Sequence, residues 1–142
     1  MEAPKIGWAI TSFADHATLV QDADLVANLI VLAWEEIGRV MQSIVGKNGV
    51  NALFHRSIEI TSTAYPWLAA ASKDPQSAIN LDALRATLLE QETSHFAAAS
   101  DTLLQHFYHL LTNLIGFSLT ERLLRPALNP LLNGAATKDV SP

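Results

Sequence analysis

Apolar residues recur three and four positions apart along most of the chain, and no alternating run of apolar and polar residues is bounded by turn residues. The first spacing is typical of helices with a buried face, and alternation is typical of half-buried strands. Leu, Ala, Gln and Glu fill the same stretches and favour helix. We therefore predict an all-α fold, a single-domain helical bundle of about five helices.

The first long helix is predicted to begin near Asp22 or Asp24 and to end near Val45. Either aspartate could accept hydrogen bonds from the first backbone N–H groups of the helix. Gly46 and Gly49 follow the last apolar positions, and glycine at that place is typical of a helix end. We expect a turn over these residues.

A second helix is predicted from about residue 50 to residue 63. Tyr65 and Pro66 should end it, because the residue before a proline disfavours helical backbone. A long helical pattern then fills residues 81–115. Ser100 is a good N-cap residue within it, so this stretch is either one helix or two.

The spacing of Ser118 and Glu121 is that of a capping box and predicts a final short helix. We expect residues 1–133 to form the helical bundle domain and residues 134–142 to form a flexible C-terminal tail. Residues 6–20 are expected to form a short helix or an arm packed on the bundle. We find no internal repeat and no low-complexity block.

Two apolar stripes run along the first long helix, and two more run along the last part of the 81–115 pattern. One small core cannot bury both sides of each helix unless that helix is central. Because large exposed apolar patches are rare on monomers, we expect one stripe of each helix to lie in a homodimer interface. The stripes assigned to the core contain Leu25, Leu29, Ala33, Val40, Ile44, Leu103, Phe107, Leu110 and Leu114. The predicted interface residues are Ile30, Trp34, Met41, Val45, Leu104, Tyr108, Leu111 and Ile115.

Composition narrows the function classes. The chain has no cysteine, which excludes a disulfide framework, a thiolate zinc site, an iron–sulfur cluster and a cysteine nucleophile. Its 9 basic and 14 acidic residues give a net charge of −5, which argues against a nucleic-acid partner that needs clustered Lys and Arg. No apolar run approaches the ~20 residues that a membrane span requires. The apolar run at residues 6–10 is short for a signal peptide, so we expect a cytoplasmic protein with no membrane partner.

Glu92 and His95 are the most suggestive pair of chemical groups, because a Glu and a His three apart share one face of a helix. The apolar stripe of that stretch predicts that both point inward, and Glu36 occupies a similar place on the first long helix. We therefore name Glu36, Glu92 and His95 as candidate ligand-binding residues. A di-iron bundle would need a second Glu-x-x-His and a further Glu, so a metal site is undetermined. The simpler alternative is that these groups pair with each other or with polar neighbours.

His106 and His109 are also three apart, and a haem ligand there is conceivable but has no other support. We expect no cofactor. The chain has no Gly-x-Ser-x-Gly, no phosphate loop and no dinucleotide-binding glycine motif. We name no catalytic residue.

These observations favour a non-catalytic regulatory or protein-interaction module, expected to be homodimeric and open to a further protein partner. The alternative is a sensor of a small molecule or metal, with an interior pocket near Glu36, Glu92 and His95. An enzyme of unknown type comes third. A sensor would show a cavity of a few hundred Å³ with converging polar groups, and an interaction module would show apolar surface to be closed by a second chain.

Overall fold

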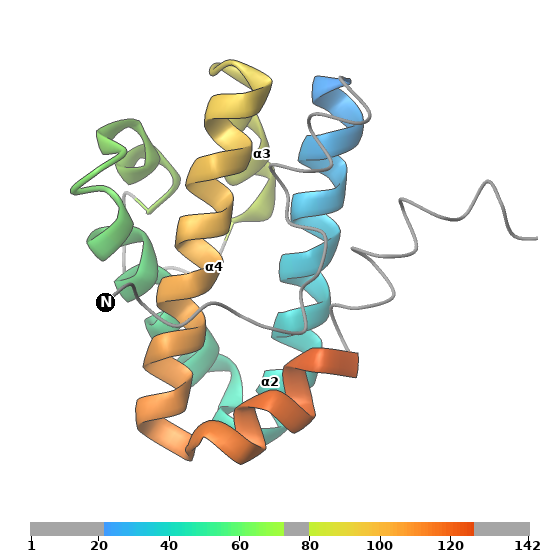
Figure 1. Cartoon of the computed structure of the whole chain (residues 1–142), viewed down its shortest axis with the longest axis vertical. Coiled ribbons are helices and arrows are strands. Elements are labelled where there is room, and N and C mark those ends of the chain that lie inside the picture. The colour runs from blue at the N-terminus through green and yellow to red at the C-terminus, as the bar shows by residue number, and fades with distance from the viewer. Residues whose placement is uncertain (1–21, 73–79, 127–142) are drawn as a thin grey trace, which may run out of the picture.

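The computed structural model describes residues 22–72 and 80–126, and these residues form helices and turns without a strand. The elements are α2 (Ala23–Thr61), the 3₁₀ helix η1 (Pro66–Ser72), α3 (Leu81–Leu89) and α4 (Thr93–Ile115). Residues 117–126 are also helical. The described part therefore confirms the all-α bundle (Figure 1). The predicted N-terminal arm at 6–20 and the predicted tail at 134–142 lie outside the described residues.

α2 consists of two helical arms that meet at Gly46. Asp22 caps its start, as predicted, because its side chain accepts hydrogen bonds from the backbone N–H groups of Asp24 and Leu25. Gly46 has φ 81° and ψ 164°, and it interrupts the helical backbone of α2. The predicted turn is therefore wrong in extent, since a single glycine makes the bend and Gly49 is already helical. We call residues 23–45 the N-terminal arm and residues 47–61 the C-terminal arm.

The long pattern over residues 81–115 divides into two helices. Asn80 caps α3 by accepting a hydrogen bond from the backbone N–H of Ala83. α3 ends at Leu89, and α4 starts after its N-cap residue Glu92. Ser100, the sequence-based candidate for the break, is buried inside α4.

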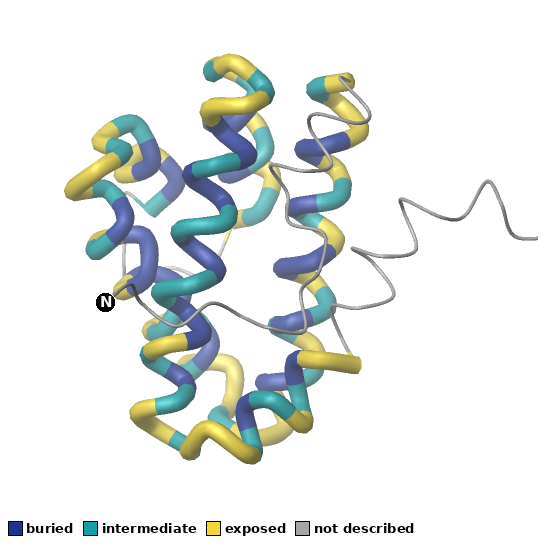
Figure 2. The backbone as a smooth tube through the Cα atoms, in the orientation of Figure 1, coloured by how far each residue is buried: buried dark blue, intermediate teal, exposed yellow. Residues whose placement is uncertain are grey.

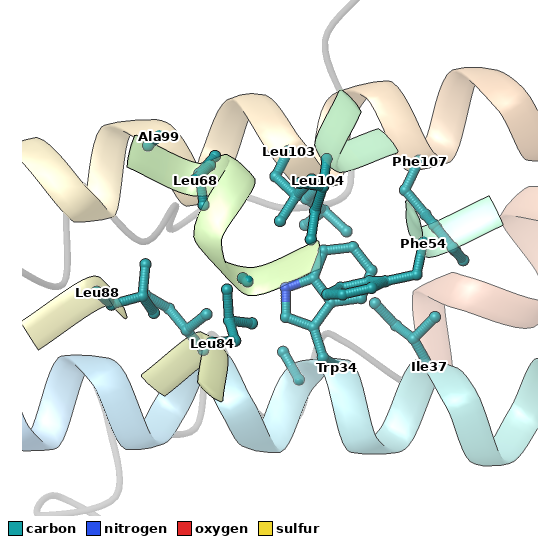
Figure 3. Close-up of a cluster of buried hydrophobic side chains, with 14 of the residues drawn as sticks. Trp34, Ile37, Phe54, Leu68, Leu84, Leu88, Ala99, Leu103, Leu104 and Phe107 are labelled. Atoms are coloured by element: carbon teal, nitrogen blue, oxygen red, sulfur yellow. The ribbon is translucent and has the colours of Figure 1, made fainter. Parts of the chain in front are cut away.

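The core lies between α2 and α4, which make the most extensive contacts of any two elements. In Figure 1 α4 runs beside the N-terminal arm of α2, and in Figure 2 the buried positions of both helices line the space between them. Trp34 stands at the centre of this core (Figure 3). Its ring centroid lies 5.0 Å from that of Phe54 and 5.1 Å from that of Phe107, and both contacts are edge-on. Edge-on aromatic pairs of this kind add about 0.5–1.5 kcal/mol beyond the area they bury.

Most of the predicted interface stripe is in this core. The six residues that a single chain already buries are Ile30, Trp34, Met41, Leu104, Tyr108 and Leu111. Val45 and Ile115 are half-buried. Large side chains of the stripes assigned to the core are exposed instead, namely Leu25, Ile44 and Leu114. Ala33, Leu103 and Phe107 of the same stripes are buried as predicted, so the single chain buries parts of both stripes. Periodicity alone could not decide this, because two apolar stripes of similar strength leave the rotation of a helix undetermined.

Candidate ligand-binding cleft at the bend of α2

A cleft of about 350 Å³ opens between the two arms of α2. Each arm contributes one helical stripe, and Leu81 of α3 and Phe107 of α4 complete the wall. The stripe from the N-terminal arm contains Trp34, Glu35, Ile37, Gly38, Arg39 and Gln42, and that from the C-terminal arm contains Lys47, Val50, Asn51 and Phe54. The spacing of three and four residues within each stripe places its members on one side of their arm. The bend at Gly46 turns these two sides toward each other.

The floor of the cleft is aromatic and apolar. Trp34 is 5% exposed, and Phe54 and Phe107 are buried. The side-chain Nε1 of Trp34 is buried and has no hydrogen-bond partner in the part of the chain that the structure describes. An unpaired buried donor costs on the order of 1–3 kcal/mol, so packing and ring contacts must offset it. Figure 3 shows the indole nitrogen on the side of the ring toward Leu84.

Gly38 leaves one wall of the cleft open. It is helical, and a Cβ atom added to it would meet nothing within 4 Å. Glycine inside a helix costs roughly 0.5–1 kcal/mol relative to alanine. The empty space at Gly38 therefore adds room to the cleft at the expense of helix stability.

The rim of the cleft carries both signs of charge. Glu35, Arg39 and Lys47 are exposed, and Arg39 forms a hydrogen-bonded ion pair with Glu36. The Arg39 hydrogen bond lowers the pKa of Glu36, and the charge of Arg39 acts in the same direction. Glu36 is thus a charged partner of Arg39 beside the cleft.

The structure does not gather the predicted ligand-binding residues. Glu92 and His95 are exposed at the start of α4, and Glu36 pairs with Arg39 on α2. The described residues contain no group of three His, Asp or Glu side chains that could hold a metal ion. The expectation of an inward-facing Glu92 presupposed a continuous helix from residue 81, and the break before Glu92 changes its direction.

His95 belongs to a small aromatic cluster with Tyr65 and Trp67. Trp67 Nε1 donates a hydrogen bond of 3.1 Å to His95 Nε2. The ring centroids of Tyr65 and His95 are 5.4 Å apart, and those of Trp67 and His95 are 5.7 Å apart. The three rings contact one another, and through these contacts the cluster connects η1 to the start of α4.

A second, more polar cavity of about 470 Å³ lies between the C-terminal arm of α2 and η1. His55 lines it and is hydrogen-bonded through Nδ1 to the hydroxyl of Ser72. Arg56 and Glu59 line it as well and form an exposed ion pair with an N–O distance of 3.0 Å. The polar groups here are engaged with each other, and we assign no ligand to this cavity.

Sequence reasoning missed the cleft because it treated the two sides of the bend as separate helices. Trp34 was predicted to lie in the dimer interface, and no role was predicted for Gly38 or Lys47. The available signal was a pair of stripes with helical spacing on either side of Gly46. Recognising it requires knowing that the bend folds one arm back on the other.

No helix in the described ranges combines the length and apolar character that crossing a membrane requires. No protein-family model, curated protein or solved structure matches this chain.

Proposed function

We propose that this protein is a non-catalytic binding module that takes a small molecule with an apolar body in the cleft at the bend of α2. This is the sensor alternative of the sequence analysis, moved from Glu36, Glu92 and His95 to a different set of residues. The observation that carries the proposal is the cleft itself, whose volume of about 350 Å³ and aromatic floor suit a small ligand. A cytoplasmic location remains part of the proposal and is supported by the absence of cysteine.

The lining indicates how such a ligand would lie. Its apolar body would rest against Trp34, Phe54 and Phe107, where burial is worth roughly 25 cal/mol per Å² of apolar surface. A polar or anionic group at its other end would remain at the rim, within reach of Arg39 and Lys47. Rim groups of this kind fix orientation more than they add affinity.

The test uses 8-anilinonaphthalene-1-sulfonate, which has an aromatic body and an anionic group. In a chain with Trp8→Phe and Trp67→Phe, Trp34 is the remaining tryptophan, and its emission should fall in a saturable, one-to-one titration. Gly38→Leu should fill the cleft and weaken binding by at least about tenfold, which corresponds to about 1.4 kcal/mol. Ser43→Leu, which adds the same side chain to the same arm outside the cleft, should leave binding unchanged.

Equal affinity of the two leucine variants, or titration without saturation, would refute the cleft as the binding site. Circular dichroism of both variants checks that each remains folded, because this dye also binds partly unfolded chains.

A protein-interaction module, expected from the sequence, is the second candidate function. Leu114 is 59% exposed and Phe117 is 61% exposed, on either side of the α4 end at Gly116. Two large apolar side chains so exposed favour a contact with another protein or a second copy. Light scattering of the wild type and of Leu114→Ser with Phe117→Ser tests it, since a dimer formed through these residues should dissociate.

A further inference from the structure

The bend in α2 depends on two glycines, for two separate reasons. Gly46 has φ 81°, a backbone conformation that other residues rarely adopt. At Gly49 an added Cβ would lie 2.9 Å from the Cβ atom of Val45 and 3.0 Å from its Cγ2 atom. Real Cβ contacts essentially never come that close, so the bent chain has no room for a side chain at Gly49. At Gly46 the space is open, and the positive φ alone disfavours a side chain.

A straight α2 would accept a side chain at both positions. In a continuous helix the Cβ atoms of residues four apart, such as Val45 and Gly49, are about 5–6 Å apart. Each glycine also destabilises a helix interior relative to alanine. The two glycines therefore disfavour a straight helix and permit the bent one. The backbone is helical on both sides of Gly46, and no loop separates the two arms.

Straightening at Gly46 would remove the N-terminal arm from the rest of its own chain. That arm contacts the C-terminal arm through Trp34 and Phe54, and it contacts α4 through Trp34 and Phe107. It also contacts α3, where Arg85 donates a hydrogen bond of 2.7 Å to Asn28. An extended arm would expose this buried face unless an equivalent surface covered it. A second copy of the chain offers the same surface.

We propose that Gly46 is an exchange hinge, at which α2 straightens and its N-terminal arm docks on the C-terminal arm, α3 and α4 of a second copy. The 39 residues of α2 would then form a helix about 58 Å long at the usual rise of about 1.5 Å per residue. Each half of this dimer repeats the core of the monomer, so the two states differ mainly at the hinge and in the entropy of association. Short hinges that join packed segments favour this exchange.

The exchanged dimer would account for the dimer-interface residues that the sequence predicts on α2. Ile30, Trp34 and Met41 are buried by their own chain in the monomer. In the exchanged dimer they would be buried by the other chain. The proposal concerns the hinge and does not rest on a ligand in the cleft.

The first experiment replaces both glycines. Gly46→Ala with Gly49→Ala should favour the exchanged dimer, with a dissociation constant at least about 100-fold lower than that of the wild type, since two helix-breaking residues are removed from each chain. Size-exclusion chromatography with light scattering measures it over a range of concentrations. Gly38→Ala is the matched control, because it makes the same change in the same helix away from the bend and should leave the wild-type assembly state unchanged.

The second experiment distinguishes exchange from ordinary surface contact. The chain has no cysteine, so Asn28→Cys with Arg85→Cys provides two unique thiols at an N-terminal-arm and α3 contact. A short bismaleimide should join them within one chain in the wild-type background and between two chains in the Gly46→Ala, Gly49→Ala background. The two-cysteine variant that keeps Gly46 and Gly49, when unfolded and refolded at high concentration, should also yield a fraction linked between chains.

Three results would overturn the proposal. They are a double alanine variant that remains monomeric, whether folded or unfolded, a dimer whose cross-links all lie within single chains, and a Gly38→Ala control that dimerises as strongly as the double variant.

Discussion

Thr61 and His106 join the end of α2 to the middle of α4 through a hydrogen bond of 2.7 Å between Thr61 Oγ1 and His106 Nδ1. The same hydroxyl donates to the carbonyl oxygen of Ser57 at 2.7 Å. A hydroxyl has one proton to donate, so Thr61 must accept from His106, whose Nδ1 therefore carries a hydrogen. Partial burial lowers the pKa of His106, and the neighbouring charge of His109 lowers it further.

This arrangement predicts a loss of stability in mild acid. Because the pKa of His106 is lower in the folded chain than in the unfolded chain, the unfolded chain binds a proton first as the pH falls below about 6.5. The free energy of unfolding should therefore decrease as the pH falls from about 6.5 to the pKa of His106 in the folded chain. The slope for this one group is at most about 1.4 kcal/mol per pH unit.

His106→Asn isolates this contribution, since asparagine can donate to Thr61 without titrating. Urea unfolding at pH 7.5, 6.5 and 5.5 should show a weaker decrease for the variant than for the wild type. Parallel pH profiles for the two proteins would contradict the assignment.

Tyr108 connects α4 to the following helical residues. Its hydroxyl donates a hydrogen bond of 2.6 Å to Glu121 Oε2, and Arg125 donates to the other oxygen of that carboxylate at 3.2 Å. Burial raises the pKa of Tyr108, and the bond to Glu121 adds to the effect. Tyr108→Phe should lower the free energy of unfolding by about 1.5–3 kcal/mol, the range for hydrogen bonds to charged groups. A double-mutant cycle with Glu121→Ala, which removes the acceptor, measures the coupling, and additive effects would show that the bond contributes nothing.

Phe54 supports both the core and the cleft. Phe54→Ala should destabilise the protein by about 3–5 kcal/mol, because it removes a buried ring that packs edge-on against Trp34. The change should also red-shift the emission of Trp34 as water enters. Leu32→Ala removes an apolar side chain that is 49% exposed and should change stability by less than about 0.5 kcal/mol. Similar losses for the two variants would mean that Phe54 is less buried than described.

Gly38→Ala should stabilise the protein by up to about 1 kcal/mol. The added methyl group meets no neighbouring atom, and alanine has the higher helix propensity. Thermal and urea unfolding measure the gain. A loss of stability would indicate that the wall of the cleft is closed against a side chain at this position.

The elements of this fold were largely predictable because their signals are local. Asp22 and Asn80 are cap residues, and Gly46 ends a helical arm, all of which a single stretch of sequence can indicate. The rotation of α2 was not predictable in this way. Leu25 and Ile30 are both large and apolar, and the contact of Trp34 with Phe54 across the bend decides that Ile30 is the buried one.

The cleft and the placement of Glu92 depended on long-range geometry. Glu92 would continue the inward stripe of Leu84 and Leu88 in an unbroken helix, but α3 ends at Leu89. No proline or glycine marks that break in the sequence. The cleft required the direction of the bend at Gly46, which φ and ψ of one residue set and which no pattern of apolar positions records.

Because a single residue makes the bend in α2, there is no loop at this point to absorb an insertion or a deletion. Each residue added to an α-helix turns everything after it by about 100° around the axis. One extra amino acid between Val45 and Lys47 would therefore rotate Phe54 away from the indole of Trp34 and swing Asn51 out of the cleft wall. Chain length at this point should be held as strictly as side-chain identity is held in the core.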